Sequence, residues 1–318
     1  MTMKHILEGY AFLYFTASDE SIDLASSNGN NGLSFTELNN GQPVLTSNLG
    51  DGGGDKFFIL ATDLCTGCGT SSWAEAPAPH GKPAHRGLGV ARPRHLLSEQ
   101  RHVRVSPPPG SNGNTWAPEA YWDRELRAYL VYWASGIYDD DDDAADPGRE
   151  RTEYQRDGVR HHGRLRDVFG EPVVWQDEPP GGRIDSTVIL EEEGGMYYRF
   201  TKATVDGCAD IVQESSPSLT AGLDGWARVA SCIGTSAEWH GRGGRPTNPG
   251  DVNGERYVLI VDELDGDGYV PLESADLTTG EWALSNNYSY PITPRRGTIL
   301  PLTAVELEAI VEAYGSAA

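Results

Sequence analysis

Short runs of alternating apolar and polar residues recur along this chain, separated by turns rich in glycine or acidic residues. In the clearest example, two predicted strands at 184–189 and 196–201 flank the acidic glycine turn 191–195. Similar sequence patterns recur at 9–15, 56–62, 116–133 and 256–262. The first of these copies, 9–15, is only a stump that contains a single predicted strand. Aromatic residues repeat through these copies about every 45 to 75 residues, the scale of a propeller blade with insertions: Tyr10, Phe57, Tyr129, Tyr197 and Tyr257. The pattern predicts a repeat of β-hairpins.

A second half follows three of these repeats, namely a short strand, then Ser with Asp or Pro, and then a turn and an aromatic residue. These halves lie at 22–35, 209–226 and 269–282. Only residues 303–314 have helical spacing, with Thr303 able to cap the helix. The length of 318 residues suits one large all-β domain over residues 1–318 that ends in a short C-terminal helix.

Three segments, 77–97, 156–168 and 236–245, interrupt this pattern. They are rich in Arg, His, Gly and Pro and lack strand periodicity, whereas the surrounding chain is acidic and aromatic. Our hypothesis is that they are translated in a shifted reading frame, because codons allowed for the first two segments, read one base along, can spell the missing second halves of the second and third repeats. We therefore expect irregular structure there, with some outer strands of the second and third repeats disrupted.

The alternatives for these segments are real basic loops or a metal cluster built from their histidines. The spacing of those histidines matches no ligand motif: His80, His85, His95, His161, His162 and His240. The acidic run 139–143 lacks the glycine and terminal glutamate of an EF-hand loop and is more typical of a solvated loop.

The formal charge of −22 argues against nucleic acid and anionic membranes as partners and favours a neutral substrate. Residues 1–7 lack the apolar core of a signal peptide, so we expect either a cytoplasmic protein or a chain whose natural start is missing. Four cysteines fall into two pairs within predicted loops, Cys65 with Cys68 and Cys208 with Cys232. An even count in loops favours disulfides and therefore secretion.

Three motifs resemble glycoside hydrolase family 43: T-W-A-P-E at 115–119, I-D-S-T-V-I at 184–189 and P-R-R-G-T at 294–298. The resemblance covers nearly the whole chain apart from the three basic segments. It implies a five-bladed β-propeller and hydrolysis of glycosidic bonds with inversion in arabinose-, xylose- or galactose-containing plant polysaccharides. In such a reaction one carboxylate activates water and a carboxylic acid protonates the leaving oxygen, while a third carboxylate keeps the pKa of the acid high.

By this resemblance Asp185 matches the third carboxylate, the pKa modulator, with an Asp that caps a strand or turn as the alternative. Trp116, Glu119 and Arg295 match substrate-binding positions, and Trp116 suits an aromatic platform for a sugar ring as well as a plain core position. The family's base belongs to an Arg-Asp-Pro segment that is missing where Gly50 runs into Asp51. Its acid belongs to a Glu-Gly-Pro segment, whereas this chain reads G-R-G-G-R-P-T at 241–247.

Codons allowed for 238–247, read one base along, can spell S-G-T-G-A-V-E-G-P-T, which contains the missing acid. Relatives tend to carry His where this chain has Arg296, so we expect no cofactor and doubt an axial calcium. We predict a monomeric, extracellular family 43-type hydrolase with an oligo- or polysaccharide substrate and impaired catalysis. The alternatives are a non-catalytic sugar-binding propeller and a propeller that serves as a protein-interaction scaffold.

Overall fold

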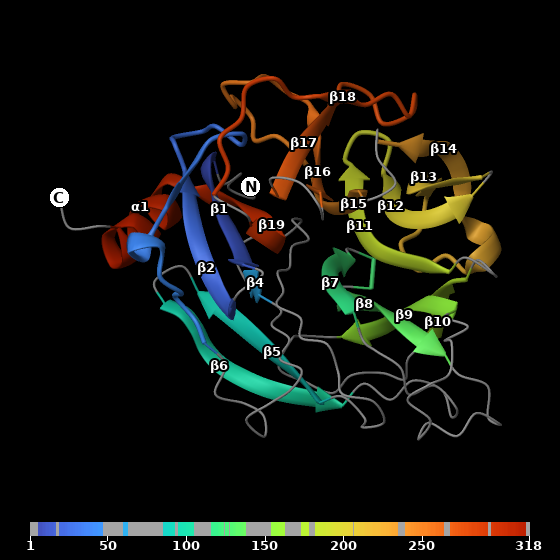
Figure 1. Ribbon diagram of the computed structural model, residues 1–318, viewed down its shortest axis with the longest axis horizontal. Coiled ribbons are helices and arrows are strands. Elements are labelled where there is room, and N and C mark those ends of the chain that lie inside the picture. The colour runs from blue at the N-terminus through green and yellow to red at the C-terminus, as the bar shows by residue number, and fades with distance from the viewer. Residues whose placement is uncertain are drawn as a thin grey trace.

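The computed structural model describes residues 6–16, 19–46, 60–62, 85–92, 95–104, 116–123, 125–126, 128–137, 154–162, 173–177, 182–205, 207–234, 239–263, 268–291 and 294–315. Its strands form five separate sheets, arranged around a common centre in Figure 1. This confirms the all-β class. Among the described residues, no helix is both long and apolar enough to cross a membrane.

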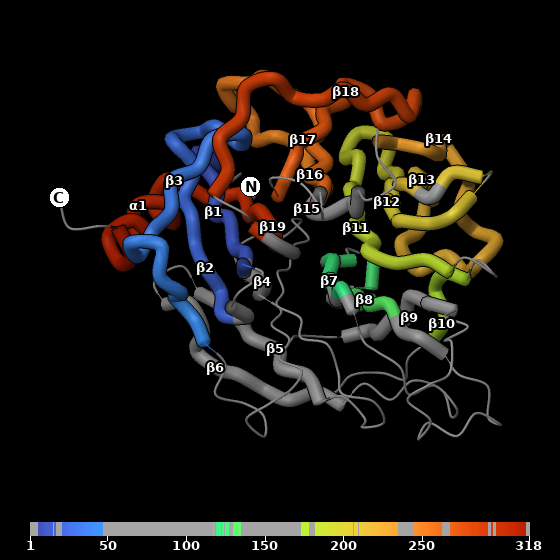
Figure 2. Tube along the Cα trace, viewed as in Figure 1, coloured from blue at the N-terminus to red at the C-terminus, as the bar shows by residue number. Residues whose placement is uncertain are grey.

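The first sheet joins the two ends of the chain. Its order is β19-β1-β2-β3, formed by Pro294–Thr303, Leu7–Thr16, Asp19–Ser27 and Phe35–Glu37. Figure 2 shows the blue N-terminal strand β1 beside the red β19, and the two pair antiparallel. The predicted stump at 9–15 is therefore the second strand of a complete four-stranded sheet, because a strand from the far end of the chain supplies the missing inner position.

The other sheets each use consecutive strands. The second has the order β4-β5-β6, formed by Leu60–Thr62, His85–Arg92 and His95–Arg104. The third has the order β10-β9-β8-β7, formed by Val173–Gln176, Tyr154–His162, Ala128–Ile137 and Trp116–Asp123. The fourth runs β11-β12-β13-β14, formed by Arg183–Glu191, Met196–Val205, Cys208–Ser216 and Ala227–Ile233. The fifth runs β15-β16-β17-β18, formed by Trp239–Pro246, Tyr257–Glu263, Gly268–Ser274 and Ala283–Leu284.

Strands also occupy the described parts of the three basic segments, which corrects the expectation of irregular structure in those parts. β5 and β6 enter the first segment, β9 the second and β15 the third. β9 pairs on both sides, with β8 and with β10. Backbone hydrogen bonds to two neighbours satisfy its amides and carbonyls without any apolar alternation in its own sequence. The reading-frame hypothesis itself stays a prediction.

The core lies between neighbouring sheets. Tyr197 packs into a cluster with Tyr132 and Trp175 of the third sheet, whereas Tyr198 packs into a cluster with Leu259 of the fifth sheet. Successive side chains of β12 thus face opposite neighbours, which is why this strand is aromatic on both faces. The inner strands contact one another in the order β7, β11, β15 and β19.

The helix α1 (Ala304–Tyr314) follows β19 directly and covers the first sheet. Thr303 is its N-cap, as the sequence predicted, and it also forms a capping box with Glu306. The short 3₁₀ helices η1 (Asn39–Gly41) and η2 (Leu223–Gly225) lie in connections. A disulfide joins Cys208 to Cys232 with a Cα–Cα distance of 5.8 Å, which confirms one predicted pair. The other pair, Cys65 and Cys68, lies outside the described residues.

Candidate active site

A β-bulge recurs in four inner strands, near the start of β7, β11 and β19 and toward the end of β15. In each case two residues of the inner strand face one residue of the next strand, so the antiparallel register shifts by one. The bulge positions are 117–118 in β7, 185–186 in β11, 243–244 in β15 and 296–297 in β19. Bulges bend a strand and re-aim its side chains, and they are common beside active sites.

The three motifs singled out in the sequence coincide with these bulges. W-A-P-E, I-D-S-T and R-R-G-T each contain the two extra residues at their centre. The three motifs therefore occupy equivalent positions, each at a bulge of an inner strand. These inner strands contact one another in the order β7, β11, β15 and β19. The third basic segment carries the same kind of bulge on β15, where the two bulge residues are glycines.

Asp185 is the first bulge residue of β11. It is 2% exposed and has a backbone φ of 63°, a left-handed conformation that costs a non-glycine residue about 1 kcal/mol or more. Ala117, at the equivalent position of β7, has a φ of 46°. Backbone strain that recurs at equivalent positions indicates that the bulge geometry is imposed by the surrounding structure.

The residue after the bulge reaches toward the next sheet. Thr187 accepts a hydrogen bond from the Gly244 amide through Oγ1 at 3.1 Å. A Cβ added to Gly244 would lie 2.8 Å from Ile189 Cγ1, so β15 can approach β11 this closely only because it carries glycine. Arg245, equivalent to Thr187, lies over the Tyr10 ring at 4.2 Å and donates to the Gly32 carbonyl. These contacts hold neighbouring bulges at a fixed separation.

A buried charge cluster lies behind the bulge of β11. Glu214 accepts hydrogen bonds from Arg183 at 2.7 Å and from Arg199 at 2.6 Å, and all three side chains are nearly inaccessible. The Arg199 guanidinium also lies 4.8 Å from the Trp175 ring centroid and 4.2 Å from that of Trp226. Burial would raise the pKa of Glu214, but the two guanidinium groups outweigh it and lower the pKa. The cluster therefore fixes Arg183, two residues before Asp185.

Comparison with known proteins identifies the family to which this arrangement belongs. Residues 5–308 match the model of a family described as a probable glycosyl hydrolase domain, related to glycosyl hydrolase family 43. The chain belongs to this family. An alpha-L-arabinofuranosidase of Bifidobacterium longum subsp. longum is 32% identical over 244 residues, which make up 67% of this chain and 22% of that protein. The family 43-related domain thus spans less than a quarter of that relative.

One solved structure shares a weaker likeness. It is an N-acetylgalactosamine deacetylase from F. plautii in complex with blood group B trisaccharide, with a TM-score of 0.33, 13% sequence identity and coverage of 66% of this chain and 55% of that chain. A likeness at this level has no bearing on the function of the family 43-related domain.

The predicted site residues of the family 43-related domain occupy different environments. Glu119 follows the bulge of β7, is 6% exposed and accepts a hydrogen bond from the Tyr132 hydroxyl at 2.7 Å. Tyr132 packs against Trp175 between the third and fourth sheets, so this environment favours a packing role for Glu119. Its role in substrate binding stays a prediction.

Trp116 and Arg295 immediately precede the bulges of β7 and β19, where Trp116 pairs with Ala134 and Arg295 with Phe15. The described structure places the backbone of these two residues but not their side chains. Their roles as a sugar platform and a substrate ligand therefore stay predictions. The segment where the family's base is expected, 49–56, lies outside the described residues.

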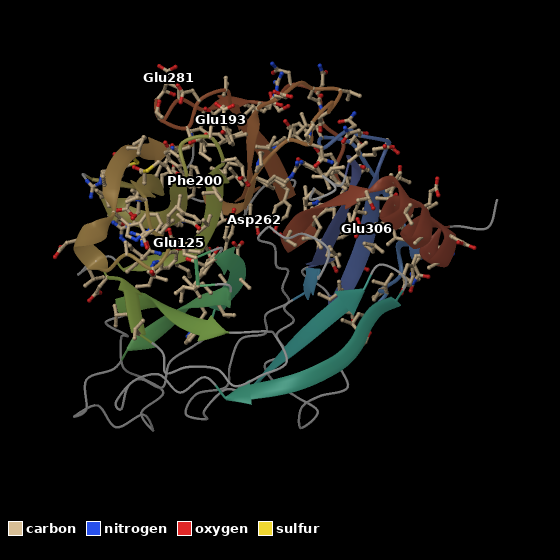
Figure 3. The ribbon with its side chains drawn as sticks, turned by 180° about the vertical axis from the view of Figure 1, so that it is seen from behind. Glu125, Glu193, Phe200, Asp262, Glu281 and Glu306 are labelled. Atoms are coloured by element: carbon tan, nitrogen blue, oxygen red, sulfur yellow. A yellow bond between two sulfur atoms is a disulfide. The ribbon has the colours of Figure 1, made fainter. Side chains whose placement is uncertain are left out.

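Asp262 is a buried carboxylate that the sequence motifs did not single out. It is 2% exposed, pairs in register with His240 of β15 and lies toward the middle of the molecule in Figure 3, whereas the exposed Glu193 and Glu281 lie toward the upper edge. The only signal in the sequence is its place at the end of the apolar run 258–261. Among the described residues, no group of three or more His, Cys, Asp or Glu side chains could hold a metal ion.

Proposed function

We propose that this chain is a glycoside hydrolase domain that acts on L-arabinofuranosyl units of a plant oligo- or polysaccharide with inversion, and that its turnover is low. The family match supports glycosidic hydrolysis. The Bifidobacterium longum relative is an alpha-L-arabinofuranosidase, which favours arabinose over xylose or galactose as the sugar. We further propose that the protein acts outside the cell as a monomer. We propose that it uses no cofactor, because Arg296 would place a cation where relatives tend to carry His.

The observation that carries this proposal is the position of Asp185. It is a buried carboxylate on a strained bulge of an inner strand, adjoining the inner strands on either side. A carboxylate there can orient a nearby carboxylic acid and raise its pKa by like-charge repulsion. This is the work of a pKa modulator in an inverting glycosidase.

Low turnover follows from the residues at the acid position. Codons read in the other frame place the acid at residue 244, where this chain has glycine. Glycine cannot donate a proton, and general acid catalysis contributes roughly 10² to 10⁴-fold. Substrates whose leaving group needs no protonation should therefore be cleaved much faster than natural oligosaccharides.

The test starts from the chain in which residues 238–247 are replaced by S-G-T-G-A-V-E-G-P-T, so that the acid is present. It compares hydrolysis of unactivated arabino-oligosaccharides by this parent protein and by its Asp185→Asn and Asp123→Asn variants. The control residue is also a buried carboxylate, but it caps the β7–β8 turn by accepting from the amides of residues 125 and 126, which an Asn oxygen can also do. We expect kcat/KM to fall about 10²-fold or more for Asp185→Asn and to change less than about twofold for the control. Equal turnover in all three proteins would show that Asp185 takes no part in the reaction.

A second experiment tests the missing acid. Replacing residues 238–247 by S-G-T-G-A-V-E-G-P-T should raise hydrolysis of unactivated arabino-oligosaccharides, while the same segment with Gln in place of its Glu should not. If both replacements leave the rate unchanged, the acid is not lost in this segment.

The alternative of a non-catalytic sugar-binding domain is favoured by the glycine pair 243–244 on β15, which supplies no carboxylate at the bulge. Calorimetric binding of arabino-oligosaccharides without hydrolysis of any aryl glycoside would support it.

A further inference from the structure

Three buried side chains form a closed ring of hydrogen bonds around the bulge that carries Asp185. Gln176 donates through Nε2 to Ser186 Oγ at 2.6 Å, and Thr201 donates through Oγ1 to Gln176 Oε1 at 3.1 Å. Ser186 Oγ and Thr201 Oγ1 are 2.8 Å apart. We call these three residues the Gln176 ring. Their exposed fractions are 1% for Gln176, 3% for Ser186 and 0% for Thr201.

The ring fixes the direction of every hydrogen bond within it. A hydroxyl group has a single proton, and that of Thr201 is directed to Gln176. The proton between Ser186 and Thr201 must therefore come from Ser186, whose oxygen in turn accepts from Gln176. A cyclic arrangement of this kind is cooperative and, in a buried site, costly to break because its members cannot turn to water.

The ring lies at the points that control the bulge. Ser186 is the second bulge residue, directly after Asp185, and Thr201 is the one residue of β12 that faces both of them. Gln176 comes from β10, the outer strand of the preceding sheet, and its Oε1 also accepts from Arg183 at 3.3 Å. Asp185 is therefore held on both sides by side chains that meet at Gln176, which ties the bulge to two sheets.

We propose that the Gln176 ring is a positioning device that holds the Asp185 carboxylate in its strained orientation for the sugar site. This inference rests on the proposed function. Its chemical reason is that a left-handed φ at a non-glycine residue persists only where the surroundings enforce it, and the ring is the described structure that spans the bulge.

The test uses a matched pair at one position. Thr201→Val keeps the shape of the side chain but removes the hydroxyl, so Ser186 loses its acceptor and the ring opens. Thr201→Ser keeps the hydroxyl and the ring, although it removes a buried methyl group. Gln176→Met opens the ring from the other side and replaces Thr201→Val if that variant does not fold.

The first readout needs no ligand. Amide resonances of Asp185 and Ser186 in ¹H–¹⁵N spectra should shift in Thr201→Val and remain near the wild-type positions in Thr201→Ser. Unmoved resonances in the valine variant would overturn the proposal whether or not the protein binds sugar.

The second readout is arabino-oligosaccharide binding by calorimetry. We expect Thr201→Val to weaken binding about tenfold, within the range of coupling between residues in one hydrogen-bonded network, and Thr201→Ser to weaken it less than about twofold. In an Asp185→Asn background the valine substitution should change binding less than about twofold, because the residue through which it acts is gone. An equal loss in both backgrounds would overturn the positioning role. A wild type that binds no sugar would overturn the proposed function, and the amide resonances would then be the test of the positioning role.

Discussion

Replacing Glu214 by Gln should cost more stability than any comparable change of a surface carboxylate. The substitution keeps the size of the side chain but removes the charge that two arginines share. Arg183 and Arg199 are 4% and 3% exposed, so neither can turn to water for compensation. Both guanidinium groups would stay buried and lose the carboxylate that they share.

The magnitude follows from this burial. Removing one member of a buried ion pair typically costs about 3 to 5 kcal/mol, because the remaining charge stays desolvated. Glu214 serves two arginines at 2.7 and 2.6 Å, which places the expected loss in the upper part of that range. A domain with a net stability of about 5 to 15 kcal/mol would lose a large share of it.

The measurement is urea unfolding of the wild type, Glu214→Gln and a control, Glu273→Gln. Glu273 also pairs with an arginine, at 2.9 Å, but the two side chains are 35% exposed for Arg256 and 17% for Glu273. Pairs open to solvent contribute about 0 to 1 kcal/mol. With a slope of about 3 kcal/mol per molar urea, Glu214→Gln should lower the midpoint by about 1 to 2 M and the control by a few tenths. Similar shifts in both variants would refute the reasoning.

The pH dependence of unfolding stability provides a second test of the same reasoning. The pKa of Glu214 is lowered in the folded protein, so the folded state binds fewer protons than the unfolded state, whose glutamates titrate near about 4.3. The stabilisation is fully present above that pH and is lost as the pH falls through the lowered pKa. The stability gap between the wild type and Glu214→Gln should therefore narrow below about pH 4.

Three further outcomes are expected. Gly297→Ala should cost about 1 to 3 kcal/mol in thermal or urea unfolding, because the added Cβ would collide with the backbone of β1, whereas Gly222→Ala, which meets open space, should be nearly neutral. Burial raises the pKa of Tyr10 to about 12, so the folded state holds its proton more tightly and stability should fall between about pH 10 and 12; Tyr10→Phe should reduce that fall. Cys208→Ser should cost about 3.5 kcal/mol under non-reducing conditions, the chain-entropy value for a disulfide whose cysteines are 24 residues apart, and an unchanged melting temperature would contradict a bond to Cys232.

The hairpins were predictable because their pattern is local. Residues 116–133 and 183–203 show alternation, a turn and an aromatic strand, and they form β7 with β8 and β11 with β12. The C-terminal helix was equally local, since its cap and capping partner are three residues apart. The pairing of β1 with β19 was not predictable from alternation alone, because it joins opposite ends of the chain.

The strands in the basic segments were not predictable for a different reason. A strand such as β9 is held by backbone bonds to β8 and β10, so the neighbours determine its structure and its own residues carry little signal. The bulges were also invisible, although the motifs that contain them were recognised. A bulge is a property of two strands in register, and Asp185 shows it only when Thr201 is seen opposite.

The environment of Glu119 shows the limit of motif-based assignment. The motif places it beside the bulge, but whether its side chain faces a pocket or the next sheet depends on Tyr132, a residue of another strand. Asp262 illustrates the opposite case, a buried carboxylate with no motif around it. Side-chain direction at such positions is a tertiary property.

The shared first sheet has a consequence for how the protein is made. Because β19 is synthesised long after β1, one side of β1 stays unpaired in the emerging polypeptide until β19 has been translated. An open strand edge of that kind is a template for association with other nascent chains. We expect newly made protein to depend on chaperones until β1 and β19 pair, and the yield in cells to depend on that interval more than on the stability of the folded protein.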